Sequence, residues 1–344
     1  MFFHVPDFVQ PEGIHMGKKD VYTRPYFADK KRFADFVNVN LYGGREIVKR
    51  EGLKGISGTY PSMGSVSGEK SRDIFMEQNH PKLRYGIELE TESDYGMPER
   101  IMVYDGGEYE KQIGEWDKEH RAKKEYRDYA EKKSRMKESD RLVPVINMVL
   151  YLGEGKWRGP RRLKEMMEVP KEIETYYADY LQDYRIYVIE ADYVDAEAYR
   201  TDLREFFQAL QCRNDKKKLW ELMRSERFQG ISRETEMAIA VNLNLKQVIR
   251  KMEEEEKNMC RAFEELIMEH EEIGIEKGKK EGIKEGIKEG IKEGLLEGLK
   301  EGVRALIETC RELGVSKEDT ESRIMLKLAV SREDAENYVN QYWD

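Results

Sequence analysis

The sequence predicts an α/β protein that continues into a mostly helical C-terminal region, and three patterns carry this prediction. Residues 85–92 alternate apolar with acidic side chains, which is the period-two pattern of a half-exposed strand. Residues 142–152 form an unbroken apolar run that ends at Gly153, as is typical of a buried strand. Helical patterns of mixed charge fill most of the remainder to about residue 272, and they lead into a glycine repeat.

The composition fits a globular protein with a heavily charged surface. The chain has 344 residues, of which 39% are hydrophobic and 38% are charged, and this length allows one large domain or two ordinary ones. The formal net charge of −9 argues against a protein that coats nucleic acid by bulk attraction, because phosphate binding depends on clustered Lys and Arg. Any contact with DNA would therefore need a local basic patch.

The cysteines and the apolar residues indicate the compartment. Cys212, Cys260 and Cys310 are odd in number and far apart, which favours neither a disulfide framework nor a CxxC metal site. The first residues meet Asp7 and Pro11 before a signal-peptide core is complete, and no apolar run approaches membrane-spanning length. We expect a soluble, cytoplasmic protein without membrane contact.

The region before the acidic strand is expected to hold an arm, a helix and a loop. Residues 1–25 carry Pro6, Pro11 and Gly13 with little periodicity, which predicts a loose arm. From Phe27 to Val48 apolar residues recur at three- and four-residue steps until Gly43-Gly44, which predicts one amphipathic helix. The glycine-rich stretch 52–70 predicts a loop or short, tightly turned strands.

A second helix and a charged segment are expected after the acidic strand. Met97-Pro98 opens the helix, which we expect to run through Gln112. Residues 115–141 are almost wholly charged with both signs interleaved, which is typical of a long solvated helix. A mobile insertion is the alternative interpretation.

The acidic strand carries candidate metal ligands. Glu88, Glu90 and Glu92 would point to one face of a strand, about 6 to 7 Å apart, while the apolar residues between them face the core. Hard cations such as Mg²⁺ take oxygen ligands, and Asp73 together with Glu88 could supply a carboxylate pair. An edge strand with a solvated acidic face would give the same alternation, so the pattern alone does not decide between them.

Five short segments stand in a fixed order along the first half of the chain. They are Phe33–Asn38, Arg72–Asp73, Tyr85–Glu92, Tyr95–Asp105 and Pro144–Pro160. Together with the glycine-repeat tail they closely resemble the recombination-promoting nuclease/transposase (Rpn) family of the PD-(D/E)XK nuclease superfamily. The resemblance covers roughly residues 18–170 well and the rest loosely. Each segment is short and tolerates many substitutions, but five such segments in the correct order are unlikely to arise by chance.

The resemblance implies a restriction-endonuclease-like PD-(D/E)XK core over residues 26–250. In such a core a helix precedes a mixed central sheet, and two acids meet at a bend between adjacent strands. Asp73 matches the first acid and Glu88 the second, so both are implied to bind Mg²⁺, with Mn²⁺ as a substitute, and to be catalytic. Glu90 stands where the superfamily usually carries Lys, or this family often Gln, to orient or activate the attacking water.

Four positions of this resemblance keep two interpretations each. Glu90 could act as a general base or further metal ligand, or it could mark altered or lost activity. Asp35 matches a helix acid that approaches the metal through water, with a structural role as the alternative. Arg72 replaces the Pro of the literal PD dipeptide and could touch a DNA phosphate or pair with an acid. Gln112 could face the DNA cleft or be an ordinary exposed polar residue of its helix.

The strongest basic cluster directly follows the predicted buried strand. Residues 156–164, called the basic segment below, contain five basic side chains and a tryptophan at a place where active-site loops often lie. These side chains would pair with DNA phosphates, and the alternative is a solvated loop whose tryptophan packs into the core. The candidate DNA-binding residues are Lys156, Trp157, Arg158, Arg161 and Arg162.

The tail, residues 251–305, is expected to be a helical, coiled-coil-like segment. Glycine recurs at every fourth position from Gly274 to Gly302, usually followed by Ile or Leu. This stripe advances about 40° per repeat around a straight helix, and its eight glycines cost the helix on the order of 8 kcal/mol relative to alanine. We expect homo-oligomerisation to offset this cost, because small residues let two helices approach closely. A flexible spacer is the alternative.

The last residues, 306–344, predict a small helical hairpin. Ser316 begins a Ser-x-x-Asp cap, and an apolar-periodic helix follows it. A second capped helix is expected from Ser331.

Two functional hypotheses follow. The first is a metal-dependent DNA endonuclease that hydrolyses phosphodiester bonds and is linked to DNA recombination or mobile elements, as the resemblance implies. The second is a catalytically impaired DNA-binding or scaffolding protein of the same fold that oligomerises through its tail, which Glu90 and the negative net charge support. Asp73 and Glu88 carboxylates close enough to share one ion, opening on a basic groove, would favour the enzyme. Carboxylates splayed apart or buried in salt bridges would favour the scaffold.

Overall fold

The computed structural model describes residues 16–61, 69–172, 174–177, 180–255 and 258–343. Its chain divides into two compact units between Ile267 and Met268, and each unit is described by itself. The first unit is an α/β structure with a mixed sheet, and the second is helical, as the sequence predicts at this level.

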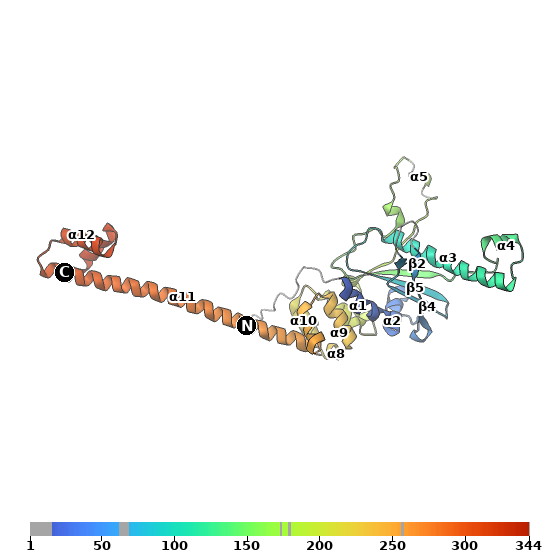
Figure 1. Cartoon of the computed structure of the whole chain (residues 1–344), viewed down its shortest axis with the longest axis horizontal. Coiled ribbons are helices and arrows are strands. Elements are labelled where there is room, and N and C mark those ends of the chain that lie inside the picture. Colours follow the sequence, from blue (N-terminus) through green and yellow to red (C-terminus); the bar gives the residue numbers. More distant parts are fainter. Residues whose placement is uncertain (1–15, 62–68, 173, 178–179, 256–257, 344) are drawn as a thin grey trace. The chain divides into compact units, whose positions relative to one another are not determined.

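A five-stranded sheet forms the centre of the first unit (Figure 1). Its order is β1 (Leu53–Gly55), β4 (Ile74–Gln78), β5 (Leu83–Glu90), β6 (Val145–Tyr151) and β7 (Val188–Glu190). Strand β4 runs antiparallel to both of its neighbours, β1 and β5, whereas β5, β6 and β7 run parallel. A separate two-stranded ribbon joins β2 (Thr59–Pro61) to β3 (Glu69–Ser71). Because parallel strands end at the same edge of a sheet, the loops after β5 and β6 are brought together.

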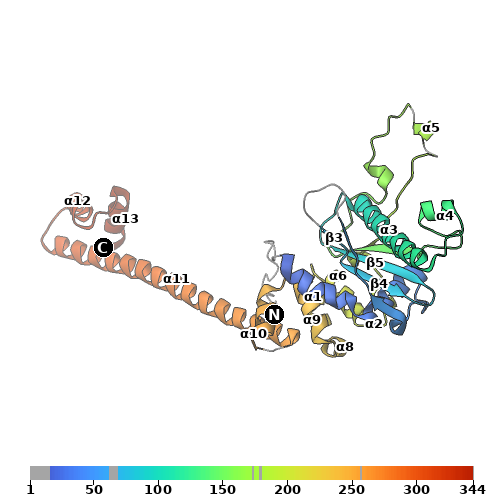
Figure 2. The same ribbon diagram turned by 45° about the vertical axis from the view of Figure 1, so that its right-hand side comes forward.

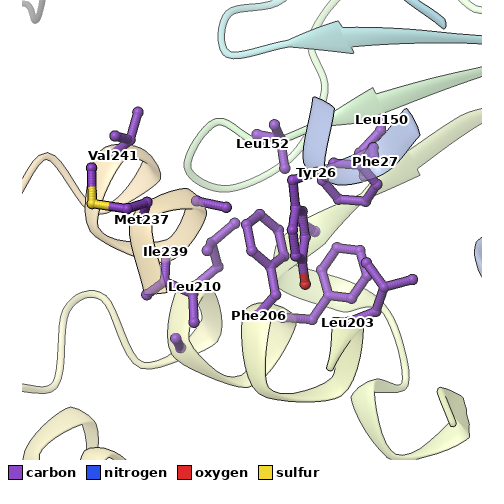
Figure 3. Packing of buried hydrophobic residues seen from close by; sticks show 14 of the residues in the cluster. Tyr26, Phe27, Leu150, Leu152, Leu203, Phe206, Leu210, Met237, Ile239 and Val241 are labelled. Atoms are coloured by element: carbon purple, nitrogen blue, oxygen red, sulfur yellow. The ribbon is translucent and has the colours of Figure 1, made fainter. Parts of the chain in front are cut away.

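The main hydrophobic core lies on one face of the sheet. Met148 and Leu150 of β6 point into it, as does Ile87 of β5. Figure 3 shows Tyr26 close to Phe206, and their ring centroids are 5.2 Å apart. The helices on this side are α1 (Met16–Ala28), α2 (Lys30–Tyr42), α6 (Leu203–Gln211), α7 (Lys216–Met223), α8 (Glu226–Gln229), α9 (Arg233–Asn242) and α10 (Lys246–Glu255).

A smaller core lies on the opposite face, beneath α3 (Met97–Lys123). Val149 and Tyr151 of β6 meet Ile101 of α3 there. Glu88 and Glu90 of β5 stand beside Val149 and Tyr151 in the parallel register, so these two acids share the face that α3 covers (Figure 1).

The N-terminal part of the chain differs from the prediction. Residues 16–25 of the expected loose arm belong to α1, because Tyr22 and its neighbours have a core to pack against, while residues 1–15 lie outside the described residues. The single helix predicted from Phe27 to Val48 is two helices. The break occurs because the Asp29 side chain accepts hydrogen bonds from the first free backbone N–H groups of α2.

Two further predictions need correction. The helix predicted from Met97 continues past Gln112 to Lys123, and residues 115–141 do not form one long helix. Lys124 adopts a left-handed conformation that ends α3, and the short α4 (Tyr129–Ser134) follows. Strand β7 was not predicted, because three residues are too few to show a periodic pattern.

The tail begins later than predicted, within α11 (Met259–Glu312). The first turns of this helix pack into the core of the first unit through Met259, Phe263 and Leu266, so residue 251 is not the boundary. The rest of α11 belongs to the second unit and continues as an unbroken helix through the glycine repeat (Figure 2).

The predicted C-terminal hairpin is confirmed. Its helices are α12 (Lys317–Leu328) and α13 (Arg332–Tyr342), and the Ser316 and Ser331 side chains each cap one of them. The hairpin buries Ile324 and Val339 against the last part of α11. Among the helices that the structure describes, none is long and apolar enough to cross a membrane.

Candidate functional site

The sheet register brings Asp73 and Glu88 together. In the antiparallel pairing of β4 with β5, Ile74 stands opposite Ile87. One residue further out, the same register sets Asp73 opposite Glu88. The Asp73 Oδ2 atom accepts a hydrogen bond of 2.9 Å from the backbone N–H of Leu89, which fixes this carboxylate at the end of β5. Two acids that are distant in the sequence are therefore neighbours on adjacent strands.

Arg24 of α1 holds the backbone at the same point. Its Nε atom donates to the carbonyl oxygen of Asp73, and its Nη2 atom donates to the carbonyl oxygen of Arg72 at 2.7 Å. This clamp connects the first helix to the start of β4. No pattern in the sequence indicates this clamp, because it joins a side chain to backbone atoms of a remote segment.

Glu88 is a buried carboxyl with an unused oxygen. Only 2% of the residue is exposed, and its Oε1 atom has no hydrogen-bond partner among the described residues. Burial, and after it the Asp73 carboxylate, raise the pKa of Glu88 to about 8, against the opposing effect of Arg72 and Arg100. Such a group binds either a proton or a cation, because a buried, uncompensated charge is costly.

Glu90 completes the acid cluster, which we define as Asp73, Glu88 and Glu90. Burial raises the pKa of Glu90, although Arg100 of α3 opposes the shift. The Arg100 Nη1 atom lies 2.8 Å from Glu90 Oε1, and the same guanidinium also pairs with Asp94. The prediction that Glu92 continues the acidic face is wrong, because β5 ends at Glu90 and Glu92 is exposed.

An open cleft lies beside the acid cluster. It has a volume of about 350 Å³ and is lined by Asp94, Gly96, Glu99, Arg100 and Tyr104. Burial, and after it the charge of Glu88, raise the pKa of Tyr104 to about 12. Glu88 is therefore near enough to the cleft to interact electrostatically with a residue that lines it. Larger cavities in the described chain are lined by other residues, at α1, α2 and α9.

Arg72 is part of a buried network behind the site and not a phosphate contact. Its Nη2 atom lies 2.6 Å from Asp105 Oδ1, its Nη1 atom donates to Asn147, and only 2% of the residue is exposed. Asn147 also donates to both oxygens of Asp105. A Cβ atom on Gly86 would lie 2.5 Å from Asn147 Oδ1, so glycine is required where this network crosses β5. Pairing with an acid was the alternative interpretation of Arg72.

Asp35 and Gln112 also have structural partners. Asp35 Oδ2 accepts hydrogen bonds from the backbone N–H groups of Arg200 and Thr201 and from the Thr201 hydroxyl. Gln112 is buried, and its side-chain amide bonds both backbone groups of Val143. Because the Oδ2 atom of Asp35 already accepts three hydrogen bonds, we withdraw the predicted metal contact of Asp35. Because Gln112 is buried, we also withdraw its predicted contact with DNA.

The basic segment lies next to the loop that follows β5. The backbone N–H of Arg158 donates to Ser93 Oγ at 2.8 Å, and a Cβ atom on Gly159 would lie 2.7 Å from the Asp94 carbonyl oxygen. Trp157 is buried, with its ring 5.5 Å from that of Tyr151, which matches its predicted alternative as a core residue.

The basic side chains of this segment divide into two kinds. Arg161 pairs with Glu190 at 2.7 Å, and Arg162 pairs with Asp183 at 3.1 Å, so acids of the chain already neutralise them. Lys156 is exposed, with its Nζ atom 5.7 Å from the centre of the Tyr193 ring, and Arg158 is exposed as well. Lys156 and Arg158 are therefore the cations of the segment best placed to meet a phosphate.

The acid cluster fits a magnesium ion with few protein ligands. No group of three or more His, Cys, Asp or Glu side chains able to hold a metal occurs among the described residues. Mg²⁺ is commonly held by one or two carboxylates, with waters and substrate phosphates in its other positions. Asp73 and the unused Glu88 oxygen suit that mode of binding.

Comparisons of the chain with protein-family models, with curated proteins and with solved structures find no match. The functional argument consequently depends on the residues of the chain and on the motifs described above.

Reasoning from sequence missed the residues that organise the acid cluster. Arg24, Arg100 and Asn147 each contact it, or the network behind it, from another element. Arg100 had one available signal, since it lies near the start of the helix that follows the acidic strand. A helix in that position is expected to pass close to the end of the strand.

Proposed function

We propose that the protein is a metal-dependent DNA endonuclease whose acid cluster lies at the meeting of β4 and β5. The observation that carries the proposal is the buried Glu88 carboxyl, which has a raised pKa, an unused oxygen and Asp73 opposite it. A helix followed by a mixed sheet, with two acids on adjacent strands, is the arrangement that the PD-(D/E)XK resemblance implies. A link to DNA recombination or mobile elements comes from that resemblance alone.

Each residue has a definite task in this proposal. Asp73 and Glu88 would hold Mg²⁺, which when bound polarises a phosphate and lowers the pKa of a water. Glu90 would orient the attacking water and accept its proton, and Arg100 keeps Glu90 in position. Lys156 and Arg158 would hold the DNA backbone beside the cleft.

The alternative is a scaffold that binds DNA without cutting it. The Arg100–Glu90 ion pair favours this alternative, because a carboxylate that is held by a guanidinium is a weaker base than a free one. The raised pKa of Glu90 acts in the opposite direction.

Nicking of supercoiled plasmid in Mg²⁺ and in EDTA separates the two. We expect metal-dependent nicking that Asp73→Asn and Glu88→Gln each reduce by roughly a hundredfold or more, since both remove a metal ligand. Glu92→Gln is the matched control, because Glu92 is an exposed acid next to β5 and outside the cluster. Glu90→Gln then measures how far its carboxylate contributes.

Two results would remove the nuclease from consideration. One is equal nicking by all the variants, which would indicate a contaminating activity. The other is no nicking by the wild type with either Mg²⁺ or Mn²⁺ while the chain still binds DNA, which would leave the scaffold. Binding itself should weaken in Lys156→Ala and Arg158→Ala, and less in Arg162→Ala, whose side chain is already paired with Asp183.

A further inference from the structure

The loops that follow the parallel strands β5, β6 and β7 form one surface at an edge of the sheet. Open α/β sheets bind their ligands at this edge, where parallel strands end. The backbone N–H of Arg158, after β6, donates to Ser93 Oγ, after β5, at 2.8 Å. The backbone N–H of Gly155 donates to Asp192 Oδ2, after β7, at the same distance. We call residues 91–96, 152–160 and 191–195 the edge loops.

Two tyrosines are exposed in the edge loops. Tyr95 is 67% exposed, and its chain neighbours Asp94 and Gly96 both line the cleft beside the acid cluster. Tyr193 is 59% exposed. A single exposed tyrosine is common on a protein surface, and Tyr129 of α4 is one as well. The order of the strands distinguishes Tyr95 and Tyr193, because β6 lies between β5 and β7 and the two tyrosines therefore flank the loop after β6.

The loop between the two tyrosines carries two cations that no acid of the chain neutralises. Among the described residues, neither Lys156 nor Arg158 has an ion pair, and both are exposed. The Lys156 Nζ atom lies 5.7 Å from the centre of the Tyr193 ring. Asp192, which anchors this loop, is itself paired with Arg213 at 2.7 Å. The anchoring acid is thus neutralised within the chain, whereas the two cations are left to meet a charge from outside.

We propose that the edge loops bind unpaired nucleotides of DNA, with one base stacked on Tyr95, another on Tyr193, and phosphates between them on Lys156 and Arg158. The inference rests on the proposed function, because it specifies the form of DNA that reaches the acid cluster. In a duplex the bases cover one another, and only their edges reach a protein through the grooves. Exposed aromatic rings with cations between them suit a single strand, whose bases have free faces. The substrate class is accordingly single-stranded or locally opened DNA.

Binding to a single strand and to a duplex tests the proposal on the full chain. Fluorescence anisotropy is measured in EDTA, so that no strand is cut. The wild type should bind a labelled strand that cannot pair with itself roughly tenfold more tightly than the blunt duplex of the same sequence, at the same salt concentration. Tyr95→Ala and Tyr193→Ala should each weaken binding of the strand roughly tenfold, and binding of the duplex far less, since each removes one stacked base. Tyr129→Ala is the matched control, because Tyr129 is exposed outside the edge loops.

Further variants separate stacking from other contributions. Tyr95→Phe and Tyr193→Phe keep the aromatic ring, so they should recover most of the affinity that the alanine variants lose. Lys156→Ala and Arg158→Ala should weaken binding of strand and duplex alike, because both forms carry phosphates. All four side chains are exposed, so the thermal unfolding of every variant should match that of the wild type.

Three results would overturn the inference. They are equal affinity of the wild type for strand and duplex, no binding of the strand at all, and alanine variants of both tyrosines that bind the strand as tightly as Tyr129→Ala. The first and third leave the nuclease untouched, since plasmid nicking by the Asp73 and Glu88 variants decides that question. Conversely, strand binding that depends on both tyrosines without any nicking would remove the nuclease and keep the inference as a property of the scaffold.

Discussion

Gly86 in the sheet and Gly278 in the repeat helix are the same type of residue, but Gly86 is tightly packed and Gly278 faces open space. A Cβ atom on Gly86 would meet Asn147 and Arg72 at 2.5 and 2.7 Å, whereas one on Gly278 would meet nothing within 4 Å. In the first unit, side chains from remote segments dictate what each position can be. In the repeat, each residue contacts only residues of its own helix. The residue types allowed there are therefore restricted by helix propensity alone or by another molecule.

The largest effect is expected where the first unit is most tightly paired. Arg72→Met leaves Asp105 buried without its cation, so we expect the free energy of unfolding to fall by about 3 to 5 kcal/mol. Urea unfolding measures the change. Arg121→Met, which breaks the half-exposed pair with Asp117 on α3, is the matched control and should cost much less, because water screens an exposed ion pair. Equal costs would mean that the network behind the acid cluster has no special importance.

The next effect depends on pH and concerns Glu88. Its pKa is about 8 in the folded chain against 4.5 when exposed, so the folded state keeps a proton that the unfolded state loses. The contribution of Glu88 to stability is therefore full below pH 4.5 and is lost as the pH rises through 8. Glu88→Gln has no proton to lose, and without metal it should gain a few kcal/mol over the wild type by pH 8, at about 1.4 kcal/mol per pKa unit.

Unfolding in EDTA at several pH values tests this prediction. Glu92→Gln should follow the wild type at every pH, because Glu92 is exposed. A Glu88→Gln advantage that does not grow between pH 5 and 8 would show that the wild-type carboxyl is not desolvated, and it would also weaken the case for a cation at this position.

The features that could be predicted from the sequence are those that depend on the residues of a single helix or strand. The alternation of residues 85–92 identified β5 and its acids, the apolar run identified β6, and two serines identified the caps of α12 and α13. Each of these signals is local, since it depends on the period of a strand or on the free N–H groups at the start of a helix.

Contacts between elements were beyond prediction from the sequence. Arg72, Asp35 and Gln112 were candidates for DNA or metal because of their positions in the PD-(D/E)XK resemblance, yet each is held by a partner far away in the sequence. A buried polar group whose hydrogen bonds are made needs no ligand to account for it, whereas an unsatisfied one calls for an explanation. Glu88 calls for such an explanation because its buried Oε1 atom lacks a partner among the described residues, as the Nε atom of Arg72 also does, and because Glu88 in addition stands opposite a second carboxylate, that of Asp73.

A smaller effect is expected from adding one methyl group to the sheet. Gly86→Ala forces Asn147 and the Arg72 guanidinium to shift, and overpacking of this kind costs about 1 to 3 kcal/mol. Gly55→Ala is the matched control, because Gly55 also lies in the sheet, in β1, and a Cβ atom there meets nothing within 4 Å. Thermal unfolding of both variants gives the difference. If Gly86→Ala is as stable as Gly55→Ala, the network is looser than its distances indicate.

The smallest effect has the opposite sign and belongs to the repeat helix. Gly278→Ala adds a methyl group in open space and removes the entropic cost of a helical glycine, so the helix should gain about 1 kcal/mol. Amide hydrogen exchange around residue 278 should slow roughly fivefold, since 1 kcal/mol corresponds to that factor. Unchanged exchange would mean that this segment is not helical in solution, and the flexible spacer would then replace the oligomerising helix as the explanation of the repeat.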